Sequence, residues 1–338
     1  MNISTYTHGR LFRRRSAERG GSALLIVLWA IAVLSVTILG AVEFVQYDCE
    51  ETTSMEKDLR ALQLAESGVA IALNPQVQKR DVEVLSQKIG PGESFEAHLR
   101  SEGGRLNINT VVQGAQWDVL EELFVTWGMR ETDAMNISNA FRIWTRADQW
   151  ALLYSGTYDA SAANAFNGLA MATPTPAQIP GLAGHTGTAQ IAIHRFQSLD
   201  EMLLIPGMEL VDTAKPDWRT YFTIWSDGPL DMNEAPADLI KAVCGVGSVQ
   251  AERFVNARLG PDGKPDTDDD VTITQMQQVQ QMLGLSNNQF QLIQGRISLQ
   301  DSVVRIESTG VLGNYRKKVM VVARRTVVPP VYLLWQEQ

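Results

Sequence analysis

The sequence predicts an α+β protein in which a long N-terminal helix packs on an antiparallel sheet and an all-α domain is inserted between early and late strands. Three observations indicate this fold. An apolar run from Ser22 continues into an amphipathic stretch that ends before Pro75. Strand-like segments follow at 93–110 and return at 296–328, and the section between them, 112–216, has mainly helical patterning. A chain of 338 residues is long enough for about two domains.

The apolar run from Ser22 to Val42 carries no charged side chain. As a helix it would be roughly 31 Å long, enough to cross the hydrocarbon core of a bilayer. Two alternatives fit less well. A helix of this length in the core of a soluble protein usually shows a polar face. The apolar part of a cleaved secretory signal is shorter, at about 7–15 residues. The run therefore predicts a membrane anchor. Five arginines lie before the run and none follows it for many residues, which predicts a cytoplasmic N-terminus; the five are Arg10, Arg13, Arg14, Arg15 and Arg19.

The helix is expected to continue beyond the membrane, from Glu43 to Leu73. Apolar residues recur on one helical face, and charged residues lie off that face. The apolar positions are Met55, Leu59, Leu62, Ala65, Val69 and Leu73. This pattern predicts a single helix, half in the membrane and half packed on a soluble domain.

The junction between the basic leader and the apolar helix resembles the type III signal of pilins and pseudopilins. That resemblance implies cleavage by a prepilin peptidase between Gly21 and Ser22, followed by methylation, with the helix left in the membrane. Most members of the family carry glutamate at the fifth mature residue, where this chain has Ile26, or Leu25 if the cut follows Gly20. A carboxylate at membrane depth is costly without a partner, so an apolar residue suits a subunit with no neighbour above it. Within the family, K-type minor pseudopilins of type II secretion lack this glutamate.

Further segments resemble K-type minor pseudopilins in order and spacing, from Gly21 to Trp335. They are 101–110 (SEGGRLNINT), 196–208 (FQSLDEMLLIPGM), 230–247 and the tail at 334–336. The resemblance implies a pilin-like fold with an inserted SAM-like or helix-hairpin-helix domain. The corresponding parts are a leader (1–21), a transmembrane and spine helix (22–75), the first part of the sheet (76–111), a helical insert (112–216) and a second part (217–338).

The resemblance also implies a structural role and no enzymatic activity. The chain would be a single-pass protein of the bacterial inner membrane with its main body in the periplasm. It would lie at the tip of a pseudopilus that supports protein export across the outer membrane. Expected partners are the I- and J-type minor pseudopilins, the major pseudopilin, the prepilin peptidase, the inner-membrane secretion platform and the lipid bilayer. A minor pilin of a type IV pilus is an alternative that shares the leader but gives no reason for the helical insert.

Local patterns predict the smaller elements. Two short strands, 95–100 and 105–110, are expected to form a hairpin around a glycine turn, and Ser198 with Glu201 is expected to form a capping box. The remaining expectations are helices at 117–127, 133–146 and 275–283, a long loop at 151–187, and strands at 218–224, 296–310 and 314–328.

The turn Gly245-Val246-Gly247 lies between two helical segments. It raises an alternative function, in which the chain is a membrane-anchored helix-hairpin-helix protein that binds DNA. Such a turn offers backbone N–H groups to phosphates, with basic residues nearby. Here residues 231–260 hold four acids and three bases. Removing the leader also takes the net charge from −9 to −13. The sequence therefore favours a turn between packed helices and predicts no nucleic-acid partner.

An acidic loop at 260–270 (GPDGKPDTDDD) is the candidate metal site. Its aspartates could supply the oxygen ligands that calcium prefers, although a solvated loop is an equally open interpretation. The candidate ligands are Asp262, Asp266, Asp268, Asp269 and Asp270. K-type pseudopilins are calcium binders, but their own acidic segment is mostly replaced here, with Trp144 and Asp148 remaining. Cys49 and Cys244 give no disulfide framework, and no catalytic constellation is evident.

Overall fold

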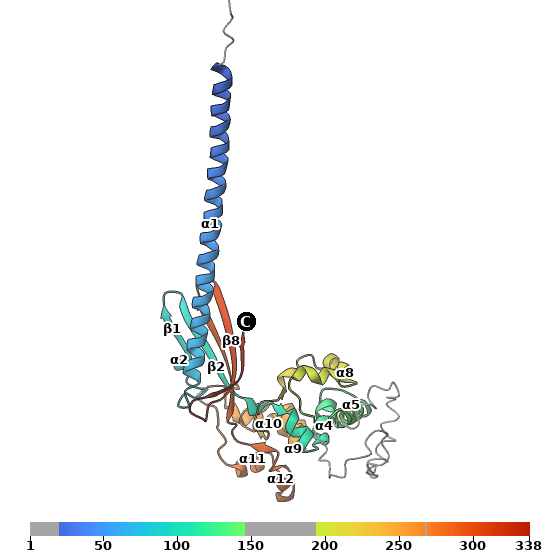
Figure 1. Cartoon of the computed structure of the whole chain (residues 1–338). Helices are drawn as coiled ribbons and strands as arrows, with labels where there is room; N and C mark the ends of the chain where they lie inside the picture. The colour runs from blue at the N-terminus through green and yellow to red at the C-terminus, as the bar shows by residue number, and fades with distance from the viewer. Residues whose placement is uncertain (1–19, 146–193, 268) are drawn as a thin grey trace, which may run out of the picture. The chain divides into compact units, whose positions relative to one another are not determined.

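The computed structural model describes residues 20–145, 194–267 and 269–338, and the chain divides into two compact units, 1–59 and 60–338 (Figure 1). Helix α1 (Gly20–Ala72) confirms the single long N-terminal helix. Its apolar part reaches a mean hydropathy of 2.7 with its side chains exposed. Among the described residues it is the one helix long and apolar enough to cross a membrane, as expected for a single-pass anchor.

The part of α1 within the second unit packs on the sheet (Figure 1). Ala65, Val69 and Leu73 are buried there, as the apolar stripe predicted. Met55 and Leu59 belong to the same stripe but are exposed, so the buried face is shorter than the sequence suggested. The helix approaches the sheet very closely at Gly310, where a Cβ would collide with backbone atoms of α1.

Five strands form the antiparallel sheet in the order β1-β2-β7-β8-β9. The bounds are β1 (Ser86–Gly90), β2 (Glu93–Ser101), β7 (Val303–Leu312), β8 (Tyr315–Arg324) and β9 (Val331–Glu337). Alternate residues of β2 and β7 face α1 and are buried, because side chains on a strand point to opposite faces. A short helix, α2 (Val82–Leu85), precedes β1. The two predicted late strands are confirmed as β7 and β8, whereas β9 was not predicted.

The predicted hairpin between 95–100 and 105–110 is wrong. After β2 the chain turns through η1 (Glu102–Gly104) and forms β3 (Leu106–Asn107), which pairs in parallel with β4 (Phe222–Thr223). The second half of the segment becomes α3 (Ile108–Gln113). The side chain of Asn107 accepts hydrogen bonds from the N–H groups of Asn109 and Thr110, so it starts this helix where a strand was expected.

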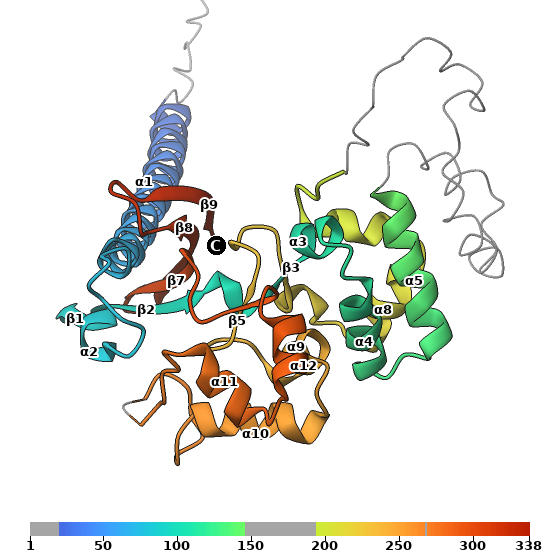
Figure 2. The ribbon, with the colours of Figure 1, turned by 90° about the horizontal axis from the view of Figure 1, so that it is seen from below.

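A second hydrophobic core, separate from that under α1, joins the helical elements into one body, with buried residues from Leu106 to Ile297. Figure 2 shows this body beside the sheet. Its first elements confirm the expected helices at 117–127 and 133–146: α4 (Trp117–Thr126) and α5 (Glu131–Trp144). The others are η4 (Leu199–Leu204), α8 (Met208–Ala214), η5 (Trp218–Thr220), β5 (Leu230–Asp231), α9 (Ala237–Cys244), α10 (Ser248–Arg258), α11 (Met276–Met282), α12 (Asn287–Ile293) and β6 (Ile297–Ser298).

Two further local predictions are corrected. The strand expected at 218–224 is mostly the 3-10 turn η5, with only the two residues of β4 extended. The capping box is not formed as predicted: Ser198 accepts from the N–H of Asp200, while Glu201 accepts from Gln197 and not from Ser198. The long loop expected at 151–187 lies outside the described residues.

Candidate functional site

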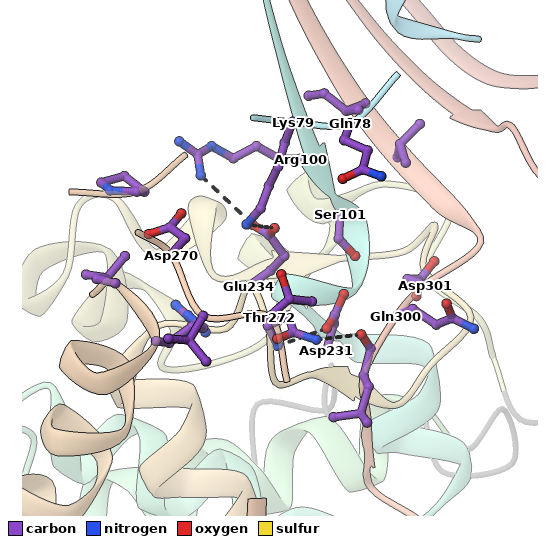
Figure 3. Close-up of a pocket in the computed structure, with 18 of the residues that line it drawn as sticks. Gln78, Lys79, Arg100, Ser101, Asp231, Glu234, Asp270, Thr272, Gln300 and Asp301 are labelled. Atoms are coloured by element: carbon purple, nitrogen blue, oxygen red, sulfur yellow. Dashed lines mark hydrogen bonds and ion pairs between the residues drawn. The ribbon is translucent and has the colours of Figure 1, made fainter. Parts of the chain in front are cut away.

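A cavity of about 400 Å³ lies between the sheet and the helical body, and several charged side chains line it (Figure 3). β2, β7, the segment after α1, and the loops around α10 all contribute lining residues. The labelled side chains in Figure 3 are mostly polar, and several carry opposite charges. The cavity therefore marks an electrostatic junction between the sheet and the helical body.

Two cations and two carboxylates form the centre of this junction. Lys79 Nζ lies 2.7 Å from Glu234 Oε1 and 3.7 Å from Asp266 Oδ1. Arg100, on β2, lies 3.0 Å from Asp266 Oδ2 and 3.9 Å from Glu234 Oε2. Burial raises the pKa of Glu234 above its ordinary value, and Lys79 opposes that shift. Arg100 of β2 and Lys79 of the segment between α1 and α2 thus both supply positive charge to Glu234, before α9, and to Asp266 of the acidic loop.

A buried ion pair connects η1 to the sheet. The side chain of Glu102 is fully buried and accepts two hydrogen bonds of 2.9 Å from Arg305 of β7. It accepts a third, of 2.6 Å, from the hydroxyl of Thr223 on β4. One carboxylate therefore joins three segments that are distant in sequence, and it fixes the direction in which the chain leaves β2.

Gly103 and Gly104 allow this turn to lie against the carboxylates behind it. A Cβ on Gly103 would approach Asp301 to 2.7 Å, and a Cβ on Gly104 would approach Glu234 to the same distance. These glycines are thus explained by close approach rather than by a hairpin. They belong to the SEGGRLNINT segment on which the resemblance to K-type pseudopilins partly depends.

Asp301 is a partly buried carboxyl of the junction. It accepts hydrogen bonds from the N–H groups of Val303 and Asp227. Burial nevertheless raises the pKa of Asp301 to about 6. Burial also raises the pKa of Asp231, which lies nearby on β5. The nearby carboxylates of Asp227 and Asp231 add to the rise in the pKa of Asp301.

The acidic loop predicted to bind calcium lies at the edge of the same junction. Asp262 and Asp269 accept hydrogen bonds from within the loop, so their oxygens are already engaged. Asp266 Oδ1 and Asp270 Oδ1 are buried and accept no hydrogen bond. In the described part of the chain, no group of three or more His, Cys, Asp or Glu is arranged to hold a metal ion. Asp268 and Asp148 lie outside the described residues, and calcium binding stays a prediction.

Of the two carboxylates with a buried oxygen that accepts no hydrogen bond, Asp266 also forms ion pairs with Lys79 and Arg100. A carboxylate oxygen that is buried without a donor is unfavourable unless a cation or water reaches it. The distance of 3.7 Å from Lys79 to Asp266 Oδ1 is too long for a good hydrogen bond.

The turn that raised the question of DNA binding is Gly245-Val246-Gly247, between α9 and α10. The N–H of Gly245 donates to the carbonyl of Lys241, and that of Gly247 donates to the side chain of Gln250. Lys241 is itself paired with Glu122 at 3.0 Å. Two of the N–H groups that a phosphate binder would present are thus engaged within the protein, and the absence of a nucleic-acid partner stays a prediction.

The remaining sequence-predicted positions are separate from this junction. Gly21 and Ser22 lie at the start of α1, and the arginines before them lie outside the described residues. Cys49 is an exposed free cysteine, and Cys244 is a buried one. Burial raises the pKa of the Cys244 thiol to about 12, so it is unreactive.

Sequence reasoning missed the ion pairs that form the junction. Glu102 and Arg305 are 203 positions apart, and Lys79 and Glu234 are 155 apart. Neither pair has a local spacing that would reveal it.

No family model and no curated protein matches the sequence. A solved structure does match: a chain in the crystal structure of the GspK-GspI-GspJ complex from the enterotoxigenic Escherichia coli type 2 secretion system. The match has 14% sequence identity and a TM-score of 0.53, and it covers 85% of this chain and 99% of that chain. The chain has the fold of a component of that complex. This finding confirms the predicted α+β, pilin-like fold and agrees with the resemblance to K-type pseudopilins.

Proposed function

We propose that this chain is a K-type minor pseudopilin of a type II secretion system and that its role is structural rather than enzymatic. The observation that carries the proposal is the combination of one apolar helix with a sheet packed on its C-terminal end, from Ala61 onward, and a helical body joined to that sheet. This arrangement matches a chain of the GspK-GspI-GspJ complex over nearly that chain's whole length. The leader junction at Gly21 and the apolar Ile26 support the same family.

The proposed position is the tip of the pseudopilus. Ile26 removes the membrane carboxylate that a subunit above would neutralise, and the helical body adds bulk beside the sheet. Both features suit a subunit that begins the assembly and has none stacked above it. In that position the chain would support protein export across the outer membrane.

The proposed placement follows from the same helix. Prepilin peptidase would cut between Gly21 and Ser22, and α1 would then remain in the bacterial inner membrane. The basic leader favours a cytoplasmic N-terminus, which puts the second unit in the periplasm. Contacts with the secretion platform and with the major pseudopilin belong to this proposal.

Co-purification tests the proposed function. The full chain would be tagged, coexpressed with the I- and J-type minor pseudopilins of the same system, and extracted from membranes in mild detergent. The expected result is a stable complex that contains all three proteins in equal amounts. Recovery of the tagged chain alone, from cells that contain both companions, would contradict the proposal.

We also propose that the acidic loop holds a calcium ion, with Asp266 and Asp270 as its first ligands. Their two buried oxygens without hydrogen-bond donors support this. When bound, calcium would neutralise charge within the loop and tie its two ends together. Calorimetric titration of the chelator-treated protein with calcium chloride tests the proposal, and the absence of saturable binding would refute it.

A further inference from the structure

A second cavity, of about 450 Å³, lies on the face of the sheet that is turned away from α1. β2 contributes His98 and Arg100 to its lining, and β7 contributes Arg305 and Glu307. These residues alternate with buried ones that face α1, because successive side chains on a strand point to opposite faces. The rest of the lining comes from the chain just after β2 and from the helical body. The cavity therefore lies where the outer face of the sheet meets the helical body.

Three arginine side chains line this cavity: Arg100, Arg105 and Arg305. Arg100 and Arg305 are directly opposite each other in the register of β2 and β7. Like charges at such positions are unfavourable. Arg105 directly follows η1, and its backbone N–H donates to the carbonyl of Glu102 at 3.2 Å, which fixes its place beside the sheet. The fold therefore gathers three positive charges at one cavity.

The carboxylates of the cavity already have cationic partners, and each of them forms an ion pair with a residue other than Arg105. The pairs are Glu102 with Arg305 at 2.9 Å, Glu234 with Lys79 at 2.7 Å and Glu307 with Lys318 at 2.6 Å. Arg100 is in turn paired with Asp266 of the acidic loop, at 3.0 Å. Among the described residues, these pairs match four cations with four carboxylates, and Arg105 is a fifth cation.

Arg105 has no carboxylate of its own. In the part of the chain that the structure describes, no hydrogen bond or ion pair joins its guanidinium to another residue, although the side chain is partly buried. Burial lowers the pKa of Arg105, and the positive charge of Arg305 lowers it further. Glu102 and Glu307 oppose this shift without forming an ion pair with Arg105. A partly buried guanidinium that lacks an acceptor is unfavourable, so an anion in the cavity would stabilise it.

The charge and the size of the cavity indicate which anion fits. A guanidinium binds carboxylates and phosphates through two parallel hydrogen bonds. A phosphate group carries a charge of about −1.5 to −2 at neutral pH, whereas the cavity has one unmatched cation and three carboxylates that would repel a second negative charge. Its volume lies within the range of small-molecule sites, which is roughly 300–1,000 Å³, and exceeds the needs of a single ion. A single carboxylate on an organic group therefore fits best.

We propose that this cavity binds one carboxylate group and that the guanidinium of Arg105 is its main hydrogen-bond donor. Arg100 and Arg305 add positive charge around the carboxylate. One N–H group of Arg305 donates to the sulfur of Met320 at 3.0 Å, a weak acceptor that a carboxylate would outcompete. The carboxylate belongs to a small organic acid or to an acidic side chain of another protein, which present the same group. The proposal does not rest on the proposed function, because it needs only this chain.

Thermal unfolding of the purified full chain in a nonionic detergent tests the site. Sodium propionate, a monocarboxylate, is titrated and compared with equal concentrations of sodium chloride. The expected result is a saturable rise in the unfolding midpoint with propionate beyond that with chloride. Arg105→Gln should weaken propionate binding by about tenfold or more, because it removes hydrogen bonds to a charged group. Arg253→Gln is the matched control, since Arg253 is an exposed arginine of α10, and it should leave propionate binding unchanged.

The stability of Arg105→Gln without propionate gives an independent measure. The substitution removes a partly buried charge and its repulsion from Arg305. Its unfolding midpoint should therefore equal or exceed that of the unmodified chain, because a charge without a partner is costly to bury. A midpoint below those of both the unmodified chain and Arg253→Gln would show that Arg105 is already satisfied within the protein, and it would overturn the proposal.

Two short peptides distinguish the sources of the carboxylate: an acetylated and amidated Ala-Glu-Ala peptide and its Ala-Gln-Ala counterpart. Tighter binding of the glutamate peptide than of propionate assigns the carboxylate to a protein side chain, and equal or weaker binding assigns it to a small acid; both results uphold the site. Equal binding of the two peptides overturns the recognition of a carboxylate. The site is also overturned if propionate acts no differently from chloride, or if Arg105→Gln binds propionate as the unmodified chain does. None of these experiments includes the companion pseudopilins, so their failure leaves the proposed function intact.

Discussion

Breaking the buried pair between Glu102 and Arg305 should destabilise the second unit strongly. Glu102→Gln keeps the shape of the side chain but removes the charge that Arg305 and Thr223 surround. Three hydrogen bonds of 2.6–2.9 Å converge on a fully buried carboxylate. Removal of one partner from such a pair costs about 3–5 kcal/mol, because the other charge stays buried and unpaired. At roughly 2–4 °C per kcal/mol, the unfolding midpoint should fall by roughly 6–20 °C.

The assay is thermal unfolding of the purified full chain, followed by circular dichroism. Arg60→Met is the control, because it breaks an exposed pair with Glu93 on the same sheet. The double variant Glu102→Met with Arg305→Met should recover most of the lost stability, since apolar residues can replace a buried pair. Equal shifts for Glu102→Gln and Arg60→Met would refute the reasoning, as would a double variant no better than Glu102→Gln.

Three further predictions concern the same region. Asn107→Ala removes the cap of α3 and a hydrogen bond to the carbonyl of Ser226, so the free energy of unfolding should fall by about 1–3 kcal/mol in urea titrations. Because burial raises the pKa of Asp301 to about 6, its contribution to stability is present below about pH 4 and is lost as pH rises through 6. The unfolding midpoint of the unmodified chain should therefore decline as the pH rises from 4 to 7, and that of Asp301→Asn should decline less steeply. The same slope in both proteins would exclude Asp301 as the cause of the decline. Calcium should raise the unfolding midpoint of the chelator-treated chain but not that of Asp266→Asn with Asp270→Asn; equal effects on both would place calcium elsewhere.

The long elements could be predicted from sequence because their patterns are local. The apolar run and the stripe of α1 extend over many turns, and the alternation in β7 and β8 repeats over ten residues in each. Such repeated signals outweigh single-residue exceptions. The helices α4 and α5 were predicted for the same reason.

The errors arose where distant contacts decide the local structure. Glu102 is held by Arg305 and Thr223, so the chain turns away from the expected hairpin and its next strand pairs with β4. β9 was missed because Pro329 and Pro330 suggested the end of the sheet, whereas the chain resumes pairing with β8 immediately after them. The acidic loop could be located from its composition, but the approach of Lys79 and Arg100 to it could not.

The intact mass of the membrane-extracted protein, expressed with and without a prepilin peptidase, tests directly whether the chain is processed as a pseudopilin. Loss of residues 1–21 is expected only when the peptidase is present. That result would establish cleavage between Gly21 and Ser22. It would support the proposed function independently of the similarity in fold. A chain that keeps its N-terminus in the presence of active peptidase would contradict its assignment as a pseudopilin.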